Sequence, residues 1–229
     1  MKENNEISPP LKNPTKGVET LLGNPRKAII KLSFPMIIAL SVHTLYTFID
    51  ALWVSGLGAD ALSAVGFFFP FLFMILALAT GIGVGGSSAI SRRIGAKDKL
   101  GADLVGTHTF VFMIFTAFAV TVPLFLAAPS IFTAMGAGHV ASTAASYGRI
   151  LFAGAVIFFF SNVAIAIMRA EGDVKRAMYA MLLGAGLNII LDPIFIYVLD
   201  LGVPGAAWAT LVSLFVSSTF LFRWLFIKK

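Results

Sequence analysis

Cysteine is absent from this 229-residue chain, and charged residues make up only 12% of it. The absence of cysteine excludes disulfides and thiolate metal sites, although it does not indicate a cellular compartment. Soluble globular proteins contain about 25% charged residues. Here 58% of the residues are hydrophobic, and 22 are phenylalanine and 21 glycine. We therefore predict a membrane protein that is solvated largely by lipid.

Long apolar runs recur along the chain and are separated by short polar connections. A helix that spans a bilayer needs about 20 mostly apolar residues. Six stretches meet this requirement and predict an all-α membrane protein, a bundle of six transmembrane helices. They are residues 29–54, 61–90, 104–128, 141–168, 175–198 and 203–226. Residues 1–25 are polar and contain no apolar signal-peptide core. We expect two parts, a cytoplasmic arm (1–25) and a transmembrane lobe (26–229).

Lysine and arginine are distributed unevenly between the two sides of this predicted bundle. All of the 17 Lys and Arg residues except Arg149 fall in the arm, in the second and fourth connections or near the C-terminal end. The positive-inside rule then places these segments, and both termini, in the cytoplasm. The net charge of +6 does not form a continuous basic stripe, so we predict no nucleic-acid partner.

Two acidic residues, Asp50 and Asp192, fall inside predicted spans, whereas the other nine lie in the arm or in connections. A charged side chain at the centre of a membrane helix costs roughly 2.5–3.5 kcal/mol and usually marks an ion or proton pathway. Each aspartate precedes the end of its predicted helix by about six or seven residues, which is about 9–10 Å. Both therefore lie at one depth below the outer surface. The alternative for each is a helix-terminal position among the lipid headgroups.

Oxygen atoms are concentrated around Asp192. Asn188 precedes it by four residues and faces the same way. Pro193 lacks an N–H, which leaves the carbonyl of Ile189 without its helical partner. Broken transporter helices supply such oxygens to cations, which makes Na⁺ a candidate ligand of Asp50, Asn188 and Asp192. A proton is the other candidate, because desolvation and a second carboxylate both favour the neutral acid.

Four further polar residues inside the spans are weaker candidates. Asn162 could ligate an ion or hydrogen-bond to a neighbouring helix. Thr210 could add a hydroxyl to the site or bond back to its own helix. His43 and Tyr46 could line a cavity or act as interior or interfacial groups.

Glycine-rich residues 81–86 formally match a dinucleotide-binding fingerprint, but they lie inside an apolar span rather than between a strand and a helix. Gly81 and Gly85 instead have a spacing that suits either close packing of membrane helices or a flexible point. No nucleophile–base set and no metal cluster stands out in the sequence. We therefore predict no enzymatic activity, no catalytic residue and no cofactor.

Four segments together resemble the multidrug and toxic compound extrusion (MATE) family. They are residues 48–58 (FIDALWVSGLG), 91–96 (SRRIGA), 168–173 (MRAEGD) and 188–195 (NIILDPIF). Their order and spacing look most similar to the prokaryotic DinF-like branch. The resemblance implies a secondary active antiporter in a prokaryotic plasma membrane. Such a transporter exports cationic, lipophilic compounds in exchange for Na⁺ or H⁺.

The resemblance also implies a site and a missing partner. The ion-coupling cluster of the family corresponds to Asp50, Asn162, Asn188, Asp192 and Thr210. A full member has twelve spans in two lobes, whereas six are predicted here. We expect the N-terminal lobe, which would pair with a missing C-terminal lobe or a second half-transporter. The alternatives are a lipid-linked oligosaccharide flippase of the same superfamily, which would need cationic residues in its cavity, and a non-transporting fragment.

Overall fold

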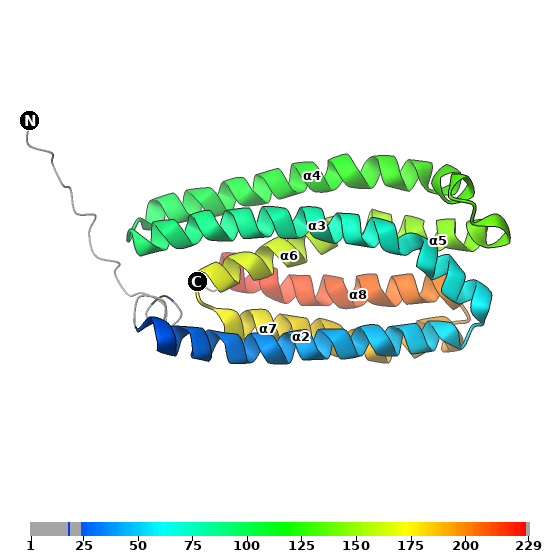
Figure 1. Cartoon of the computed structure of the whole chain (residues 1–229), viewed down its shortest axis with the longest axis horizontal. Coiled ribbons are helices and arrows are strands. Elements are labelled where there is room, and N and C mark those ends of the chain that lie inside the picture. Colours follow the sequence, from blue (N-terminus) through cyan, green and yellow to red (C-terminus); the bar gives the residue numbers. More distant parts are fainter. Residues whose placement is uncertain (1–17, 19–23, 228–229) are drawn as a thin grey trace, which may run out of the picture.

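A computed structural model describes residue 18 and residues 24–227. Long helices run back and forth in one bundle (Figure 1). The α-helices are α2 (Pro25–Ser55), α3 (Ala59–Gly95), α4 (Lys99–Ala134), α5 (Ala141–Ala153), α6 (Ala155–Ala170), α7 (Val174–Pro193) and α8 (Gly202–Phe222). Short segments follow three of them, a 3₁₀ turn η1 (Gly138–Val140) and two π-helical segments, η2 (Ile194–Val198) and η3 (Arg223–Ile227).

The helices confirm the predicted bundle of six membrane spans. Five of them are long and apolar enough to cross a bilayer singly, and the bent pair α5–α6 makes the sixth span. The helices extend beyond the predicted apolar runs at several ends; α3, for example, covers 59–95 rather than 61–90. The predicted arm, residues 1–25, lies almost entirely outside the described residues.

Consecutive helices are joined at alternating ends of the bundle (Figure 1). The start of α2 and the α3–α4 and α6–α7 turns lie at one end, and the other connections lie at the opposite end. Arg92 and Arg93 precede the first of these turns, and Lys175 and Arg176 follow the second. The basic residues are therefore gathered at one end in space. The placement of that end in the cytoplasm stays a prediction.

The fourth predicted span is broken in the middle. Its two halves meet at Gly154 and differ in direction by 48°. A Cβ atom on Gly154 would collide with the side chain of Leu211 on α8. Glycine at this position therefore lets the bent span approach α8. The apolar pattern continues through the break, which is why the sequence did not predict it.

The centre of the bundle contains α6 and α8, with α3 and α4 on one side and α2 and α7 on the other (Figure 1). Buried aromatic rings fill the space between α3 and the bent span, where the ring centroids of Phe68 and Phe152 are 5.3 Å apart. Hydroxyl groups also link α8 to α7 and α6. Ser217 of α8 donates to the carbonyl of Ala180 at 2.7 Å, and a 2.6 Å hydrogen bond joins Ser161 of α6 to Ser218 of α8.

Close helix packing by glycine occurs on α3, but at other positions than predicted. A Cβ atom on Gly86 would lie 2.5 Å from a methyl carbon of Thr109 on α4, and one on Gly83 would lie 3.0 Å from a side chain of α6. A Cβ atom on Gly81 or Gly85 would have nothing within 4 Å. These two residues instead line an open groove between α3 and α4. The packing alternative for Gly81 and Gly85 was wrong within the described residues, because four-residue spacing does not show which face of a helix meets its neighbour. The alternative of a flexible point stays a prediction.

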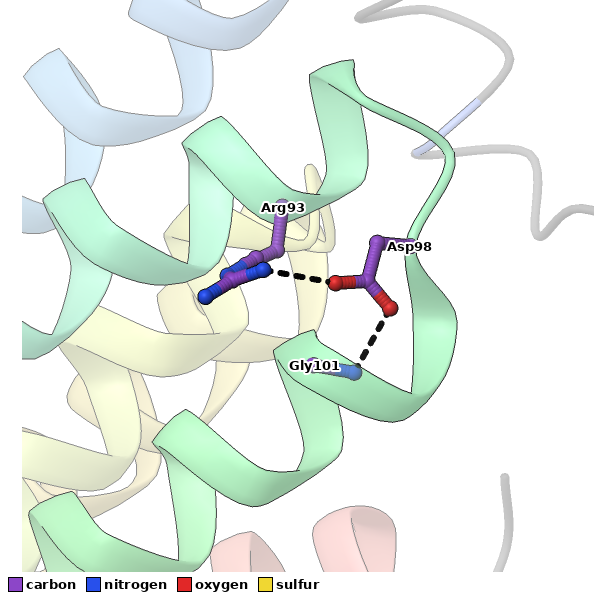
Figure 2. A network of polar contacts seen from close by, with 3 residues as sticks. All are labelled: Arg93, Asp98 and Gly101. Atoms are coloured by element: carbon purple, nitrogen blue, oxygen red, sulfur yellow. Dashed lines mark hydrogen bonds and ion pairs between the residues drawn. The ribbon is translucent and has the colours of Figure 1, made fainter. Parts of the chain in front are cut away.

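The turn between α3 and α4 is held by a single carboxylate, as Figure 2 shows. Asp98 accepts a hydrogen bond from the Gly101 amide at 2.8 Å and pairs with Arg93 at 2.9 Å. Lys97 adopts a left-handed conformation (φ 59°) just before it. The Gly101 amide, and then Arg93, hold the pKa of Asp98 below its ordinary value. Asp98 thus begins α4 as its N-cap and also ties the end of α3 to it.

We expect Asp98→Ala to lower the melting temperature, because the cap and the ion pair are both lost. Asp98→Asn should lie between wild type and Asp98→Ala, since its amide oxygen still caps α4. A carboxyl with a lowered pKa stabilises the fold above its ordinary pKa and loses this effect as the pH falls through the folded-state value. Melting curves in detergent at neutral and acidic pH should therefore differ less between wild type and Asp98→Ala at the acidic pH. An equal difference at both values would contradict this account of the turn.

Candidate functional site

The two membrane carboxylates meet where α2 packs against α7 (Figure 1). Asp50 lies five residues before the end of α2, and Asp192 lies in the last turn of α7, before η2. The two carboxyl groups lie close enough to influence each other electrostatically. Asp192 is 0% exposed and Asp50 is half-buried. The two helices therefore bring these side chains to one depth and into one site.

Asn188 and Thr210 complete the contacts around Asp192. The Asn188 amide nitrogen donates to Asp192 Oδ1 at 3.2 Å and to Thr210 Oγ1 at 3.4 Å. Asn188 is 2% exposed, and Thr210 reaches it from α8. Three helices, α2, α7 and α8, thus contribute to the cluster of Asp50, Asn188, Asp192 and Thr210, which we call the carboxylate site.

Several oxygen atoms of the carboxylate site are acceptors without donors. Within the described part of the chain, Asp50 Oδ1, Asn188 Oδ1 and Asp192 Oδ2 are buried and have no hydrogen-bond partner. An unsatisfied buried polar group costs about 1–3 kcal/mol. A proton or a cation would satisfy these atoms. Residues 18 and 24–227 contain no group of three His, Cys, Asp or Glu side chains that could hold a metal ion. A cation here would therefore need amide or hydroxyl oxygens beside the two carboxylates.

Two tyrosines from different helices lie near this site. Tyr46 lies one turn before Asp50 on α2, and Tyr147 is buried on α5. Both are within electrostatic range of Asp50 and Asp192. His43 is exposed, and its ring centroid lies 4.9 Å from that of Tyr46. Sequence reasoning missed Tyr147, because a lone tyrosine in an apolar span gives no signal of which helix it faces.

Asn162, in contrast, bonds back to its own helix. It is half-buried on α6, and its amide nitrogen donates to the carbonyl of Phe158 in its own helix at 3.1 Å. None of the side-chain hydrogen bonds that the structure shows for Asn162 within residues 24–227 reaches the carboxylate site. A role for Asn162 as an ion ligand therefore stays a prediction.

Comparison with known proteins shows that this chain is similar to transporters. The MatE family model matches residues 35–194. The probable multidrug resistance protein YoeA of Bacillus subtilis is 33% identical over 180 residues, which cover 76% of this chain and 38% of that protein. The multidrug export protein MepA of Staphylococcus aureus is 31% identical over 191 residues, covering 82% of this chain and 42% of that protein.

Solved structures agree with the sequence relatives. A MOP superfamily transporter from Pyrococcus furiosus is 54% identical and superposes with a TM-score of 0.91, covering 95% of this chain and 48% of the other. A MATE transporter in the straight conformation is 53% identical with a TM-score of 0.92, covering 94% and 48%. The chain thus spans about two fifths of the curated relatives and about half of the solved transporters.

Proposed function

This chain belongs to the MatE family, and we propose from that membership that it is the ion-coupling lobe of a secondary active multidrug efflux antiporter. The coupled ion is H⁺ or Na⁺, and it binds at the carboxylate site. The exported compounds are cationic and lipophilic. The second lobe of the transporter, or a second half-transporter, supplies the other wall of the cavity. The lobe lies in the plasma membrane with its basic end in the cytoplasm.

One observation carries this proposal. A buried carboxyl group of α7 and a half-buried one of α2 lie close together inside a membrane-spanning bundle, and one buried oxygen atom of each has no hydrogen-bond partner. Two negative charges 4 Å apart repel by about 4 kcal/mol at an effective dielectric constant of 20. A bound proton or Na⁺ removes this repulsion.

The coupling follows from the positions of the two carboxylates on separate helices. With the ion bound, α2 and α7 are held together through Asp50 and Asp192. When the ion leaves, repulsion favours an arrangement in which α2 lies farther from α7. Ion binding thus biases the lobe between two states by its differential affinity for them. Asn188, which also bonds to Thr210, orients one oxygen atom of Asp192.

A lipid-linked oligosaccharide flippase of the same superfamily is the competing candidate. Recognition of a pyrophosphate requires cationic side chains at the site. In the described residues the polar contacts of the carboxylate site involve acids, an amide and a hydroxyl. This polarity fits a cationic ligand and argues against the flippase. A non-transporting fragment would retain the fold without any ion dependence.

The direct test separates the two ions and the two candidate substrates. Sodium and proton gradients are imposed separately on vesicles that contain this lobe paired with its second lobe. We expect export of a cationic fluorescent dye under one of the two gradients and not under the other. A lipid pyrophosphate should not be moved under either gradient. Dye export that ignores both gradients, or transport of the pyrophosphate, would contradict the proposal.

A further inference from the structure

The outer ends of α2 and α7 make a second contact, one turn beyond the carboxylate site. The hydroxyl of Tyr197 donates to the backbone carbonyl of Trp53 at 2.6 Å. The Trp53 and Tyr197 rings also meet edge to face, with centroids 6.1 Å apart. Trp53 lies three residues after Asp50, and residues at this spacing share a helix face. The two contacts therefore follow each other along the same α2–α7 interface.

The Trp53 carbonyl is available because α2 ends there. In a continuing helix this oxygen would accept from the Leu57 amide, but that amide donates to Val54 at 3.0 Å instead. The last carbonyls of a helix need partners from elsewhere. Tyr197, which lies 144 residues farther along the chain, provides one. The hydrogen bond is thus a tertiary cap rather than an incidental surface contact.

The π-helical segment η2 explains how Tyr197 reaches α2. Five residues of α-helix turn through about 500°, which would leave Tyr197 about 140° around the axis from Asp192. A π-helix bonds each amide to the carbonyl five residues back and turns less per residue than an α-helix, so the π-helical residues of η2 reduce this angle. The Leu199 amide bonds to the carbonyl of Ile194 at 2.8 Å, five residues back. The wider turn thus places Tyr197 and Asp192 on neighbouring sides of α7.

The other side of η2 is fixed by α8. A Cβ atom on Gly205 would lie 2.5 Å from the carbonyl oxygen of Phe195 and 3.0 Å from the nitrogen of Ile196. The backbones of η2 and α8 are therefore in direct contact at Gly205. The Tyr197 hydroxyl therefore approaches α2 from a segment whose backbone is closely packed on α8.

We propose that Tyr197 is a positioning residue for the carboxylate site, whose hydrogen bond to the Trp53 carbonyl holds the outer end of α2 against α7. The inference rests on the proposed ion-coupling role of Asp50 and Asp192. The latch, as we call the Tyr197–Trp53 hydrogen bond, sets how closely Asp50 approaches Asp192. It does not touch the ion.

Gly56 gives the latch a specific geometric signature. A Cβ atom on Gly56 would collide with the Tyr197 hydroxyl, while the backbone of Gly56 is right-handed helical (φ −63°, ψ −17°) and accepts alanine without strain. Gly56→Ala should therefore open the latch by displacing the hydroxyl. Tyr197→Phe removes that hydroxyl, and the methyl group of Gly56→Ala then no longer collides with it. The two substitutions should be non-additive, as expected of a direct contact.

The absence of cysteine allows a test by spin labelling. Cysteines introduced at Leu52 on α2 and Leu126 on α4, which are 68% and 69% exposed, report the position of the outer end of α2 relative to the rest of the bundle. We expect the distance distribution between the two labels, measured by double electron–electron resonance in lipid nanodiscs, to broaden and shift in Tyr197→Phe. Gly56→Ala should cause a similar change, and the double variant should be no worse than Tyr197→Phe. Tyr179 is a 54% exposed tyrosine on α7, and Tyr179→Phe should match wild type.

Ion binding by the same samples separates positioning from general stability. Tyr197→Phe should raise the half-saturating concentration of Na⁺ or H⁺ about 5- to 10-fold, the effect of one hydrogen bond. Tyr179→Phe should leave it unchanged.

An unchanged distance distribution in Tyr197→Phe, or additive effects of Gly56→Ala and Tyr197→Phe, would overturn the latch. A changed distance with unchanged ion binding would overturn the positioning role. If Asp192→Asn also bound the ion normally, the proposed function itself would be wrong.

Discussion

Asp192→Asn is expected to reduce binding of the coupled ion at least about 100-fold in the isolated chain and to abolish ion-driven export in the paired transporter. The substitution keeps the shape of a fully buried side chain and removes its charge. A charge–cation contact at 4 Å contributes about 4 kcal/mol at an effective dielectric constant of 20, or roughly a thousandfold in affinity. The carboxamide can neither take up a proton nor attract Na⁺ as a carboxylate does. Binding of radioactive sodium and proton uptake measured with a pH dye in nanodiscs follow both ions separately.

Asp200→Asn is the matched control for this substitution. Asp200 is exposed in the turn between η2 and α8 and has a left-handed backbone (φ 51°). Asparagine tolerates that conformation as well as aspartate does. The control therefore removes one negative charge close by in the sequence without touching the carboxylate site. Normal ion binding by Asp192→Asn, or an equal loss in Asp200→Asn, would count against a role for the buried pair.

Gly205→Ala is expected to have the largest effect on stability among glycine substitutions on α7 and α8. The added methyl would lie 2.5 Å from the carbonyl oxygen and 2.7 Å from the carbonyl carbon of Phe195. These are backbone atoms, so no side-chain rotation relieves the overlap. Overpacking of this kind costs about 1–3 kcal/mol. For a chain of this size, that cost corresponds to a loss of about 3–10 °C in melting temperature.

Gly186→Ala provides the comparison, because a Cβ atom there would have nothing within 4 Å. Alanine is favoured over glycine inside a helix by about 1 kcal/mol. Gly186→Ala should therefore melt at or above the wild-type temperature, while Gly205→Ala melts below it. Melting curves in one detergent, followed by circular dichroism, make the comparison. Equal melting temperatures for the two variants would contradict the close contact between η2 and α8.

The six membrane spans were predictable because bilayer thickness imposes a length and an apolar composition on each of them. Asp50 and Asp192 stood out for a related reason, since charge is rare in such spans. Their depth followed from helix geometry and the odd numbering of their spans. None of these arguments required knowledge of which helices touch. The contact between α2 and α7 comes only from the structure.

What the sequence did not predict depends on local backbone geometry. The break at Gly154 and the π-helical turn after Pro193 preserve an apolar pattern, so periodicity gives no sign of them. The same holds for the glycines of α3, where Gly83 and Gly86 pack closely instead of Gly81 and Gly85. Tyr197 was missed because its direction depends on the wider π turn. These features decide where the side chains of the carboxylate site point.

The most direct test of the central claim is a comparison of ion binding by Asp50→Asn, Asp192→Asn and the double variant. If the two carboxylates form one site, each single variant should lose binding of the same ion, and the double variant should bind it no more weakly than the weaker single variant. Separate sites would give losses that add. Wild-type binding by Asp50→Asn, or additive losses in the double variant, would show that the buried pair is not the ion-coupling site.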